Sequence, residues 1–288
     1  GVFYGIQTVL QEVTAYDGKV KVGVIKDAPR YEWRGYMLDE SRHFFGVQQV
    51  KQILDVMAYY KLNKFHWHLT DAPGWRIEIK AYPLLAEVGS KSNYSNPEAP
   101  AAYYTQDQIK DIVAYAAIRH IEIVPEIDMP GHETAANRAY PENGVGDGES
   151  FTLNPGKECV YEFYTNVLKE VTELFPSRYL HLGADEVAIG SRTWSSDPYI
   201  KALMKREGMT EITEAEAYFD KKMTEVAHGL GRRVLTWDDV LDIGVERSGD
   251  DLITWWRHER RDHLYEGLKQ GYGLILCPRL PLYYDFVQ

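Results

Sequence analysis

The sequence predicts a (β/α)8 barrel of the TIM type, truncated after its seventh strand. Seven short apolar runs alternate with amphipathic helical stretches, which is the pattern of a parallel sheet covered by helices. Polar and aromatic residues stand at the C-terminal end of nearly every run, where a barrel builds its active-site face. A doubly wound open sheet is the alternative. It is disfavoured because it often has a glycine-rich loop after its first strand, and none follows residues 35–38.

The predicted elements follow one another along the chain. The apolar runs predict strands at residues 35–38, 64–69, 121–125, 179–182, 233–236, 252–254 and 274–276. In the first predicted helix, Val47, Val50, Leu54 and Met57 fall on one face. The same spacing predicts the other helices at residues 105–116, 160–174, 214–230 and 263–269.

The first 28 residues do not follow this alternation of strands and helices. We expect residues 1–28 to be the C-terminal end of a preceding α/β domain, and residues 29–288 to be a barrel that lacks its last strand. The chain starts at Gly1, with no initiator Met and no basic leader segment, so we interpret the start as processed or trimmed.

Composition excludes two classes of partner. The formal net charge of -11 repels the phosphate backbone of nucleic acids. No apolar run approaches the roughly 18–20 residues that a membrane span needs. The two cysteines, Cys159 and Cys277, are predicted to be unpaired thiols in the core, with one disulfide as the alternative. The 21 Tyr and 7 Trp suit the apolar faces of sugar rings, although large aromatic residues also fill ordinary cores.

Two adjacent acids, Asp185 and Glu186, follow the fourth predicted strand. Neighbouring residues in a regular strand point to opposite faces, so both acids reach one site only where the strand breaks. Gly183 and Ala184 directly upstream make such a break plausible. The alternative is a structural role, because acidic pairs commonly occupy the first turn of a helix, where they interact favourably with the helix dipole.

Two histidines, His66 and His68, share one face of the second predicted strand. Histidines spaced in this way at the end of a barrel strand can bind a metal ion. The alternative is that one packs in the barrel interior and the other orients a catalytic group. A metal site of this kind needs further ligands on later strands, which the sixth and seventh strands do not offer.

Several other polar residues stand close to strand ends. His132 lies in a Pro-Gly turn just after two acids, Glu126 and Asp128, which suits proton handling near a carboxylate. The alternative is a solvated histidine, which is the usual case for a lone histidine in a turn. Arg42 follows the first strand and is a candidate clamp for hydroxyl or carboxylate groups, or a structural ion pair. Tyr283 and Asp285 follow the seventh strand and share one face.

Five segments occur in order along the chain, at residues 34–44, 65–76, 125–132, 181–186 and 283–285. Their sequences contain RGYMLDESRHF, FHWHLTD with GWR, PEIDMPGH, HLGADE and YYD. Together they resemble the family-20 glycoside hydrolases, the β-N-acetylhexosaminidases, from about residue 34 to the end. The opening FYGIQT looks like the end of the small α/β domain that precedes the barrel in this family.

The resemblance implies retaining, exo-acting hydrolysis of a terminal N-acetylhexosamine by substrate assistance. The 2-acetamido oxygen of the substrate would attack the anomeric carbon and give an oxazolinium ion. Glu186 would protonate the leaving oxygen and then deprotonate the incoming water. Asp185 would accept a hydrogen bond from the acetamide N–H, and Tyr283 would donate one to the acetamide oxygen.

The resemblance also implies a supporting relay. His132 and Asp71 would tune Glu186, with Asp128 in support. Arg42 would grip ring hydroxyls of the terminal sugar. No metal ion or other cofactor is implied.

The pocket walls follow from the same resemblance. Trp237 and Trp256 would enclose the acetamide group, with Trp255 as a possible substitute for Trp256. Asp285 would help to hold the ring hydroxyls. The expected partner is an oligosaccharide or glycoconjugate with a terminal N-acetylhexosamine, in a secreted, periplasmic or lysosomal-type compartment. The choice between GlcNAc and GalNAc stays open, as does the oligomeric state.

Two departures from the family pattern matter. The family usually has Gly-Gly before Asp-Glu, whereas Ala184 takes the second position here. The Trp and Glu of the family's eighth strand are absent, so we expect much lower activity than in a full-length parent. The competing functions are a catalytically impaired N-acetylhexosamine-binding module and a metal-dependent barrel hydrolase built on His66 and His68.

Overall fold

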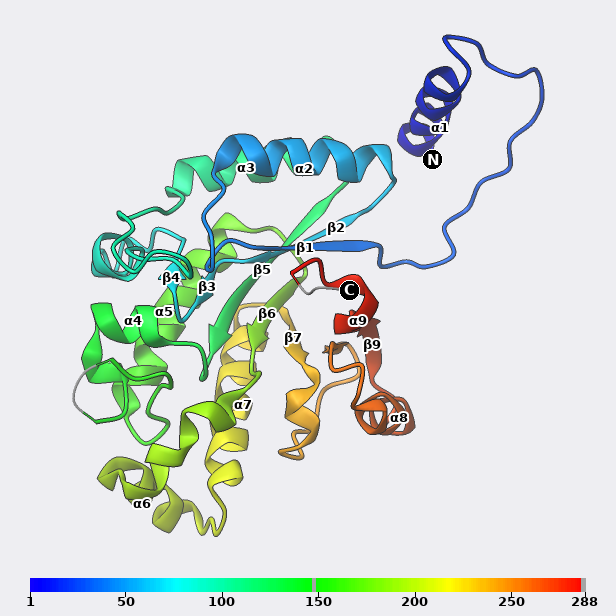
Figure 1. Cartoon of the computed structure of the whole chain (residues 1–288). Helices are drawn as coiled ribbons and strands as arrows, with labels where there is room; N and C mark the ends of the chain where they lie inside the picture. Colours follow the sequence, from blue (N-terminus) through cyan, green and yellow to red (C-terminus); the bar gives the residue numbers. More distant parts are fainter. Residues whose placement is uncertain (147–148, 286–288) are drawn as a thin grey trace.

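Seven parallel strands form one curved sheet (Figure 1). The computed structural model describes residues 1–146 and 149–285, and the order of the main sheet is β1-β2-β5-β6-β7-β8-β9. These strands are Gly35–Asp39, Lys64–His68, Glu122–Met129, Tyr179–Gly183, Arg233–Trp237, Leu252–Trp255 and Gly273–Leu276. A doubly wound sheet would reverse its strand order at a switch point. The unbroken order therefore confirms the barrel-type prediction.

The strands agree closely with the predicted runs, with one clear difference. β5 was expected to end at Pro125, but it continues to Met129. Pro125 pairs with Trp67 on β2, and the strand then shifts register against β6 between Glu126 and Met129. This extension carries the strand past its proline and brings Asp128 to the end of β6.

Helices cover the outer face of the sheet. They are α2 (Val47–Tyr59), α3 (Gln106–Ala117), α5 (Glu158–Leu174), α7 (Ile212–Gly229) and α8 (Arg261–Lys269), and the first four pack side by side in this order. Thr105 caps α3 with a reciprocal capping box to Gln108. The shorter helices α4 (Thr134–Ala139) and α6 (Pro198–Glu207) lie in segments that connect strands, and α9 (Arg279–Leu282) follows β9. None of these three was predicted.

The two faces of the sheet differ in chemistry. Phe65 and Trp67 on β2 point into the large apolar core beneath the helices. His66 and His68 alternate with them and lie on the inner face, where both are buried. The strand alternation therefore gives the molecule an apolar outer layer and a polar barrel interior.

A small hairpin follows β2 at the same end of the sheet. Its strands are β3 (Thr70–Asp71) and β4 (Gly74–Trp75). Arg76, directly after it, is 1% exposed and donates to five backbone carbonyls of the surrounding loops. The hairpin thereby fixes Asp71 at the rim of the barrel interior.

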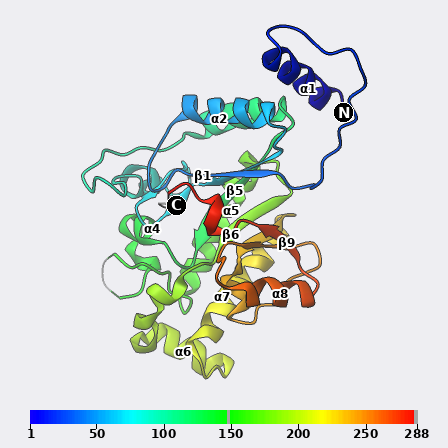
Figure 2. The same ribbon diagram turned by 45° about the vertical axis from the view of Figure 1, so that its right-hand side comes forward.

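Helix α1 (Val2–Ala15) lies outside the barrel (Figures 1 and 2). A long segment without regular structure joins it to β1. Phe3 packs against the edge of the large core, and Gln11 Nε2 donates to the Tyr59 carbonyl at 2.6 Å. The division of the chain at residue 28 stays a prediction.

Cys159 and Cys277 are both free thiols, as expected, but Cys159 is exposed in the first turn of α5, so the prediction of a core position is wrong for this residue. Within the described residues, no helix combines the length and the apolar character that crossing a lipid bilayer requires.

Candidate active site

A sharp break in the backbone follows β6. Gly183, Ala184 and Glu186 have positive φ angles of 68°, 69° and 52°; we call residues 183–186 the acidic turn. A left-handed conformation costs an L-residue roughly 1–2 kcal/mol, so the turn holds backbone strain. Asp185 Oδ2 and Glu186 Oε2 come within 3.5 Å and 3.4 Å of one atom, His132 Nε2. The predicted strand break is confirmed.

Two glycines allow neighbouring segments to approach the acidic turn. A Cβ atom at Gly183 would lie 1.8 Å from Asp128 Oδ1. A Cβ atom at Gly131 would lie 2.9 Å from the Asp185 carbonyl oxygen. The ends of β5 and β6 therefore meet closely only because both positions lack a side chain.

The structural alternative for the acidic pair finds little support. Glu186 stands before a 3-10 helix of only three residues, Val187–Ile189, and its side chain makes no capping hydrogen bond. Its side chain is 39% exposed and is directed toward His132 instead. The pair is arranged around a histidine and does not serve as a helix cap.

His132 connects the acidic turn to a buried carboxylate. Its Nδ1–H donates to Asp71 Oδ1 at 2.9 Å. The other carboxylate oxygen, Asp71 Oδ2, lies 2.5 Å from Arg42 Nη1 and 2.8 Å from His68 Nε2. The predicted contact between His132 and Asp71 is therefore present, and it continues to Arg42 and His68.

The charges in this network support one another. Burial alone would raise the pKa of Asp71, but His132, His68 and Arg42 lower it below its usual value. Burial would likewise lower the pKa of His132, but Asp185 and Asp71 raise it well above its usual value. We conclude that His132 is a cation and Asp71 an anion at neutral pH.

Asp128 behaves differently. Burial, and then the negative charge of Asp185, raise its pKa well above its usual value, so this carboxyl is neutral. Its Oδ1 accepts a hydrogen bond from Ala184 N at 3.3 Å. Asp128 thus fastens the acidic turn to β5 without adding a second negative charge beside Asp185.

Aromatic side chains stand on the neighbouring strands. Trp237 at the end of β7 is 4% exposed. Trp256 follows β8 and stacks on Tyr283, with ring centroids 6.5 Å apart and planes inclined by 17°. Trp255 instead donates its indole N–H to the Arg260 carbonyl at 3.0 Å. The structure therefore pairs Trp256, and not Trp255, with Tyr283.

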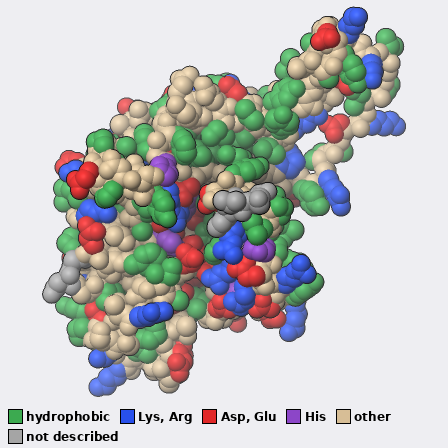
Figure 3. All heavy atoms as spheres, viewed as in Figure 1, with side chains coloured by type: hydrophobic (Ala, Val, Ile, Leu, Met, Phe, Trp, Pro, Cys, Tyr) green, Lys and Arg blue, Asp and Glu red, His purple; other side chains and the backbone are tan. Residues whose placement is uncertain are grey.

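Tyr283 and Asp285 lie on the C-terminal segment beside β9. Tyr283 is half-buried, and burial, followed by smaller contributions that include Asp185, raises the pKa of its phenol. The phenol is thus protonated and able to donate a hydrogen bond toward the acidic turn. Asp285 is exposed, at the edge of this group. Figure 3 shows acidic, basic and histidine side chains gathered near the middle of this face.

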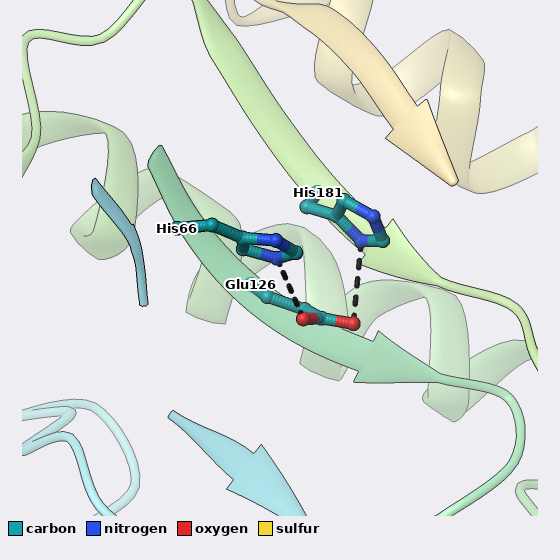
Figure 4. A group of neighbouring side chains, drawn as sticks. All are labelled: His66, Glu126 and His181. Carbon is teal, nitrogen blue, oxygen red and sulfur yellow. Dashed lines mark ion pairs between the residues drawn. The ribbon is translucent and has the colours of Figure 1, made fainter. Parts of the chain in front are cut away.

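A buried carboxylate to which the sequence assigned no separate role, Glu126, organises the barrel interior. Glu126 Oε2 lies 2.7 Å from His66 Nε2 and 2.7 Å from His68 Nδ1. Its Oε1 lies 3.3 Å from His181 Nδ1 and accepts the Trp237 indole N–H at 2.8 Å. Figure 4 shows the rings of His66 and His181 next to each other, each paired with a different oxygen of this carboxylate.

The charges around Glu126 are divided between the histidines. Burial opposes the ionised form of Glu126, but the three histidines hold its pKa well below the usual value. Burial lowers the pKa of His66 to about 4. Burial would also lower the pKa of His68, but the carboxylates of Glu126 and Asp71 have the larger combined effect and raise it. His68 is therefore the cation between two carboxylates. It connects Asp71, at the rim, to Glu126 in the barrel interior.

The same clusters contain donor sets that a metal ion uses, namely His66, Glu126 and His181; His68, Asp71 and Asp128; and Asp128, His132 and Asp185. Contacts of ion-pair length also join members of each set: 2.7 Å between His66 Nε2 and Glu126 Oε2, 2.8 Å between His68 Nε2 and Asp71 Oδ2, and 3.5 Å between His132 Nε2 and Asp185 Oδ2. The same residues therefore form an ion-pair network.

Sequence reasoning assigned roles to ten residues of this site and none to two others. Glu126 was noted only as one of two acids before His132, because the strand was expected to end at Pro125 and nothing in the sequence placed Glu126 among the histidines of the barrel interior. Asp239 lies two residues after Trp237, the last residue of β7, and its Oδ1 accepts the Glu186 backbone N–H at 2.9 Å. Asp238 and Asp239 follow an apolar strand, as the other predicted site residues do. This pattern could have identified Asp239 from the sequence.

Comparisons with known proteins agree with this geometry. Residues 31–288 match Glycosyl hydrolase family 20, catalytic domain. A beta-hexosaminidase of Porphyromonas gingivalis is 38% identical over 96% of this chain, which spans 38% of that protein. The solved beta-N-acetylhexosaminidase of Bacteroides fragilis is 35% identical, with a TM-score of 0.86 over 96% of this chain and 56% of that chain.

A further solved relative carries a sugar. The family-20 exo beta-N-acetylglucosaminidase of Vibrio harveyi, in complex with N-acetylglucosamine, is 37% identical with a TM-score of 0.80. The match covers 87% of this chain and 42% of the Vibrio protein. Fold, strand order and the matched length agree, and the chain belongs to glycosyl hydrolase family 20, in its catalytic domain.

Proposed function

We propose that this domain is an exo-acting, retaining β-N-acetylhexosaminidase that works by substrate assistance. The observation that carries the proposal is Asp185 Oδ1, a buried acceptor that has no hydrogen-bond partner among the described residues. An unpaired buried acceptor beside a proton-transfer group suits the N–H of a substrate's 2-acetamido group. The sugar bound to the Vibrio harveyi relative carries this group, which supports the assignment.

The first chemical step needs no nucleophile from the protein. The acetamide oxygen attacks the anomeric carbon as the bond to the leaving oxygen breaks, and Glu186 transfers its proton to that oxygen. Asp185 accepts the acetamide N–H and stabilises the positive charge that develops on the oxazolinium ion. The phenol of Tyr283 donates to the acetamide oxygen and orients it for attack.

The second step reverses the proton transfer. Glu186, now a carboxylate, removes a proton from a water that attacks the anomeric carbon, and the oxazolinium ring opens to restore the acetamide. Two displacements retain the configuration at that carbon. The cationic His132 lies 3.4 Å from Glu186 Oε2 and stabilises the carboxylate between the steps.

The remaining predicted residues surround the sugar in this proposal. Trp237 and Trp256 bound the acetamide pocket, and the apolar face of the pyranose suits such aromatic surfaces. Arg42 and Asp285 bind ring hydroxyls. The substrate class is an oligosaccharide or glycoconjugate with a terminal N-acetylhexosamine. Such substrates support a secreted, periplasmic or lysosomal-type location, which fractionation of the source cells tests.

A panel of aryl glycosides that differ only at C2 and C4 tests the proposal. Substrates with a 2-acetamido group are hydrolysed, whereas those with a 2-hydroxyl are not, and a thiazoline that mimics the oxazolinium ion inhibits. Glu186→Gln removes the activity on unactivated substrates, and chelators leave the parent unchanged. Equal rates on 2-hydroxyl substrates would overturn substrate assistance. Sugar binding without turnover would indicate a binding module instead.

A further inference from the structure

We propose that Asp239 is a positioning residue that fixes Glu186 and Trp256, which follow β6 and β8, relative to each other. Asp239 follows β7, Glu186 follows β6 and Trp256 follows β8. Asp239 Oδ1 accepts the Glu186 backbone N–H at 2.9 Å, and Asp239 Oδ2 accepts the Trp256 indole N–H at 3.0 Å. One carboxylate thus joins the proposed proton-transfer residue to the proposed wall of the acetamide pocket. The inference rests on the proposed function.

The acidic turn requires such an anchor. Three of its four residues have left-handed backbone, and such conformations persist only where the surroundings hold them. Asp128 holds the upstream end through Ala184 N. Asp239 holds the downstream end through Glu186 N. Without Asp239, the strained residue that carries the reactive carboxyl would be free to relax toward ordinary backbone angles.

The chemistry of the anchor requires an ionised carboxylate. Asp239 is 6% exposed, and its Oδ1 also contacts the Arg257 guanidinium. Arg257 supplies the opposite charge that a buried carboxylate needs. An ionised carboxylate only accepts hydrogen bonds, so it satisfies three donors at once, whereas an asparagine offers one oxygen and two N–H donors. Asp239→Asn must therefore lose either the Glu186 or the Trp256 contact.

The effect of this loss depends on the leaving group of the substrate. A displaced Glu186 transfers its proton poorly, which slows substrates whose leaving oxygen needs protonation. A dinitrophenolate leaves without protonation. We therefore expect kcat/KM of Asp239→Asn to fall about 10²-fold on a phenyl N-acetyl-β-glucosaminide and less than about tenfold on the dinitrophenyl analogue. Asp239→Glu, which keeps two acceptor oxygens, restores at least part of the loss.

Asp242→Asn is the matched control. Asp242 lies three residues further on and contacts Arg257, Arg260 and His263. Among the contacts of the described residues, none joins Asp242 to Glu186 or Trp256. We expect it to change both rates by less than about threefold, since exposed ion pairs contribute little. Equal losses on both substrates in Asp239→Asn would mean a merely structural role and would overturn the inference.

A second readout does not depend on turnover. In a proton–nitrogen NMR spectrum of the full chain, the indole signal lost in Trp256→Phe identifies Trp256. This signal should shift and exchange faster with solvent in Asp239→Ala, which removes both acceptor oxygens, but stay in place in Asp242→Asn. An unchanged Trp256 signal in Asp239→Ala overturns the contact. If the parent hydrolyses neither substrate, the proposed function fails, and the NMR comparison still decides the role of Asp239.

Discussion

His132 and Asp71 form a buried ion pair, with His132 Nδ1 2.9 Å from Asp71 Oδ1. The side chains are 5% and 2% exposed, so solvent screens their attraction weakly. The opposite side of the imidazole faces Glu186. The pair therefore fixes both the charge and the orientation of the ring that the proposed proton-transfer residue meets.

The pair gives the stability of the protein a defined pH dependence. The lowered pKa of Asp71 contributes stability that is present above its unfolded value of 3.8 and is lost as pH falls toward the folded value. The raised pKa of His132 contributes stability that is complete below its unfolded value of 6.5 and is lost as pH rises through the folded value. Both contributions are therefore largest between about pH 4 and 6.5.

Asp71→Asn should lower the free energy of unfolding by roughly 3–5 kcal/mol at pH 6, because it leaves buried cations without their partner. Denaturant unfolding of the parent and the variant at pH 6 and pH 3 measures the difference. The difference should shrink at pH 3, because there the unfolded parent binds a proton at Asp71 that the folded parent does not bind. A difference that grew on acidification would contradict the assigned ion pair.

Glu126→Gln should be among the most destabilising single changes to the barrel floor. The carboxylate is fully buried and contacts three histidines and the Trp237 indole. Loss of its charge leaves the cationic His68 with one carboxylate fewer, for a cost of roughly 3–5 kcal/mol. In a chain of this size, this corresponds to a fall in Tm of roughly 6–20 °C by calorimetry.

Glu122→Gln is the control on the same strand. Glu122 pairs with Lys64 near the surface, and its side chain is 30% exposed. We expect a loss of at most about 1 kcal/mol, as is usual for exposed ion pairs. Similar melting temperatures for the two variants would show that Glu126 does not hold the barrel interior together.

Gly183→Ala should disrupt the acidic turn. The new methyl group would lie 1.8 Å from Asp128 Oδ1, and the residue would have to keep a φ of 68°. Overpacking and left-handed strain each cost about 1–3 kcal/mol, so we expect a lower Tm and loss of most activity. Gly208→Ala, at a helix end with a φ of 71° and open space around the Cβ position, isolates the cost of the backbone strain. Equal effects at both positions would refute the steric argument.

Much of the fold could be predicted because apolar residues recur clearly along the chain, in short strand runs and at helical spacing between them. The alternation at Phe65, His66, Trp67 and His68 marked both faces of β2, and all seven strands were located. The continuation of β5 beyond Pro125 could not be predicted, since it depends on pairing with β6. Local patterns identify an element, whereas its end is decided by its neighbours.

The candidate site was predicted less completely than the fold. Residues at strand ends, such as Asp185 and His132, were visible because polar groups there interrupt an apolar pattern. Glu126 lies within its strand, and its importance arises only when three strands bring histidines to it. Ala184 was noted as a departure from the family pattern. Its left-handed backbone is accommodated in the structure, and its methyl group is buried beside Val240.

Tyr283→Phe should lower kcat more than it raises KM. The phenol of Tyr283 is protonated and stacks on Trp256, so removing its oxygen preserves the ring packing and deletes one hydrogen-bond donor. Donors aimed at the reacting group of a substrate typically contribute about 10²–10³-fold to kcat. Steady-state kinetics on an aryl N-acetylglucosaminide measure the effect. Tyr284→Phe, on a neighbouring side chain that is 85% exposed, should leave the kinetics unchanged. Equal losses in both variants would show that the substitutions act by perturbing the C-terminal segment, and not by removing the hydroxyl group of Tyr283.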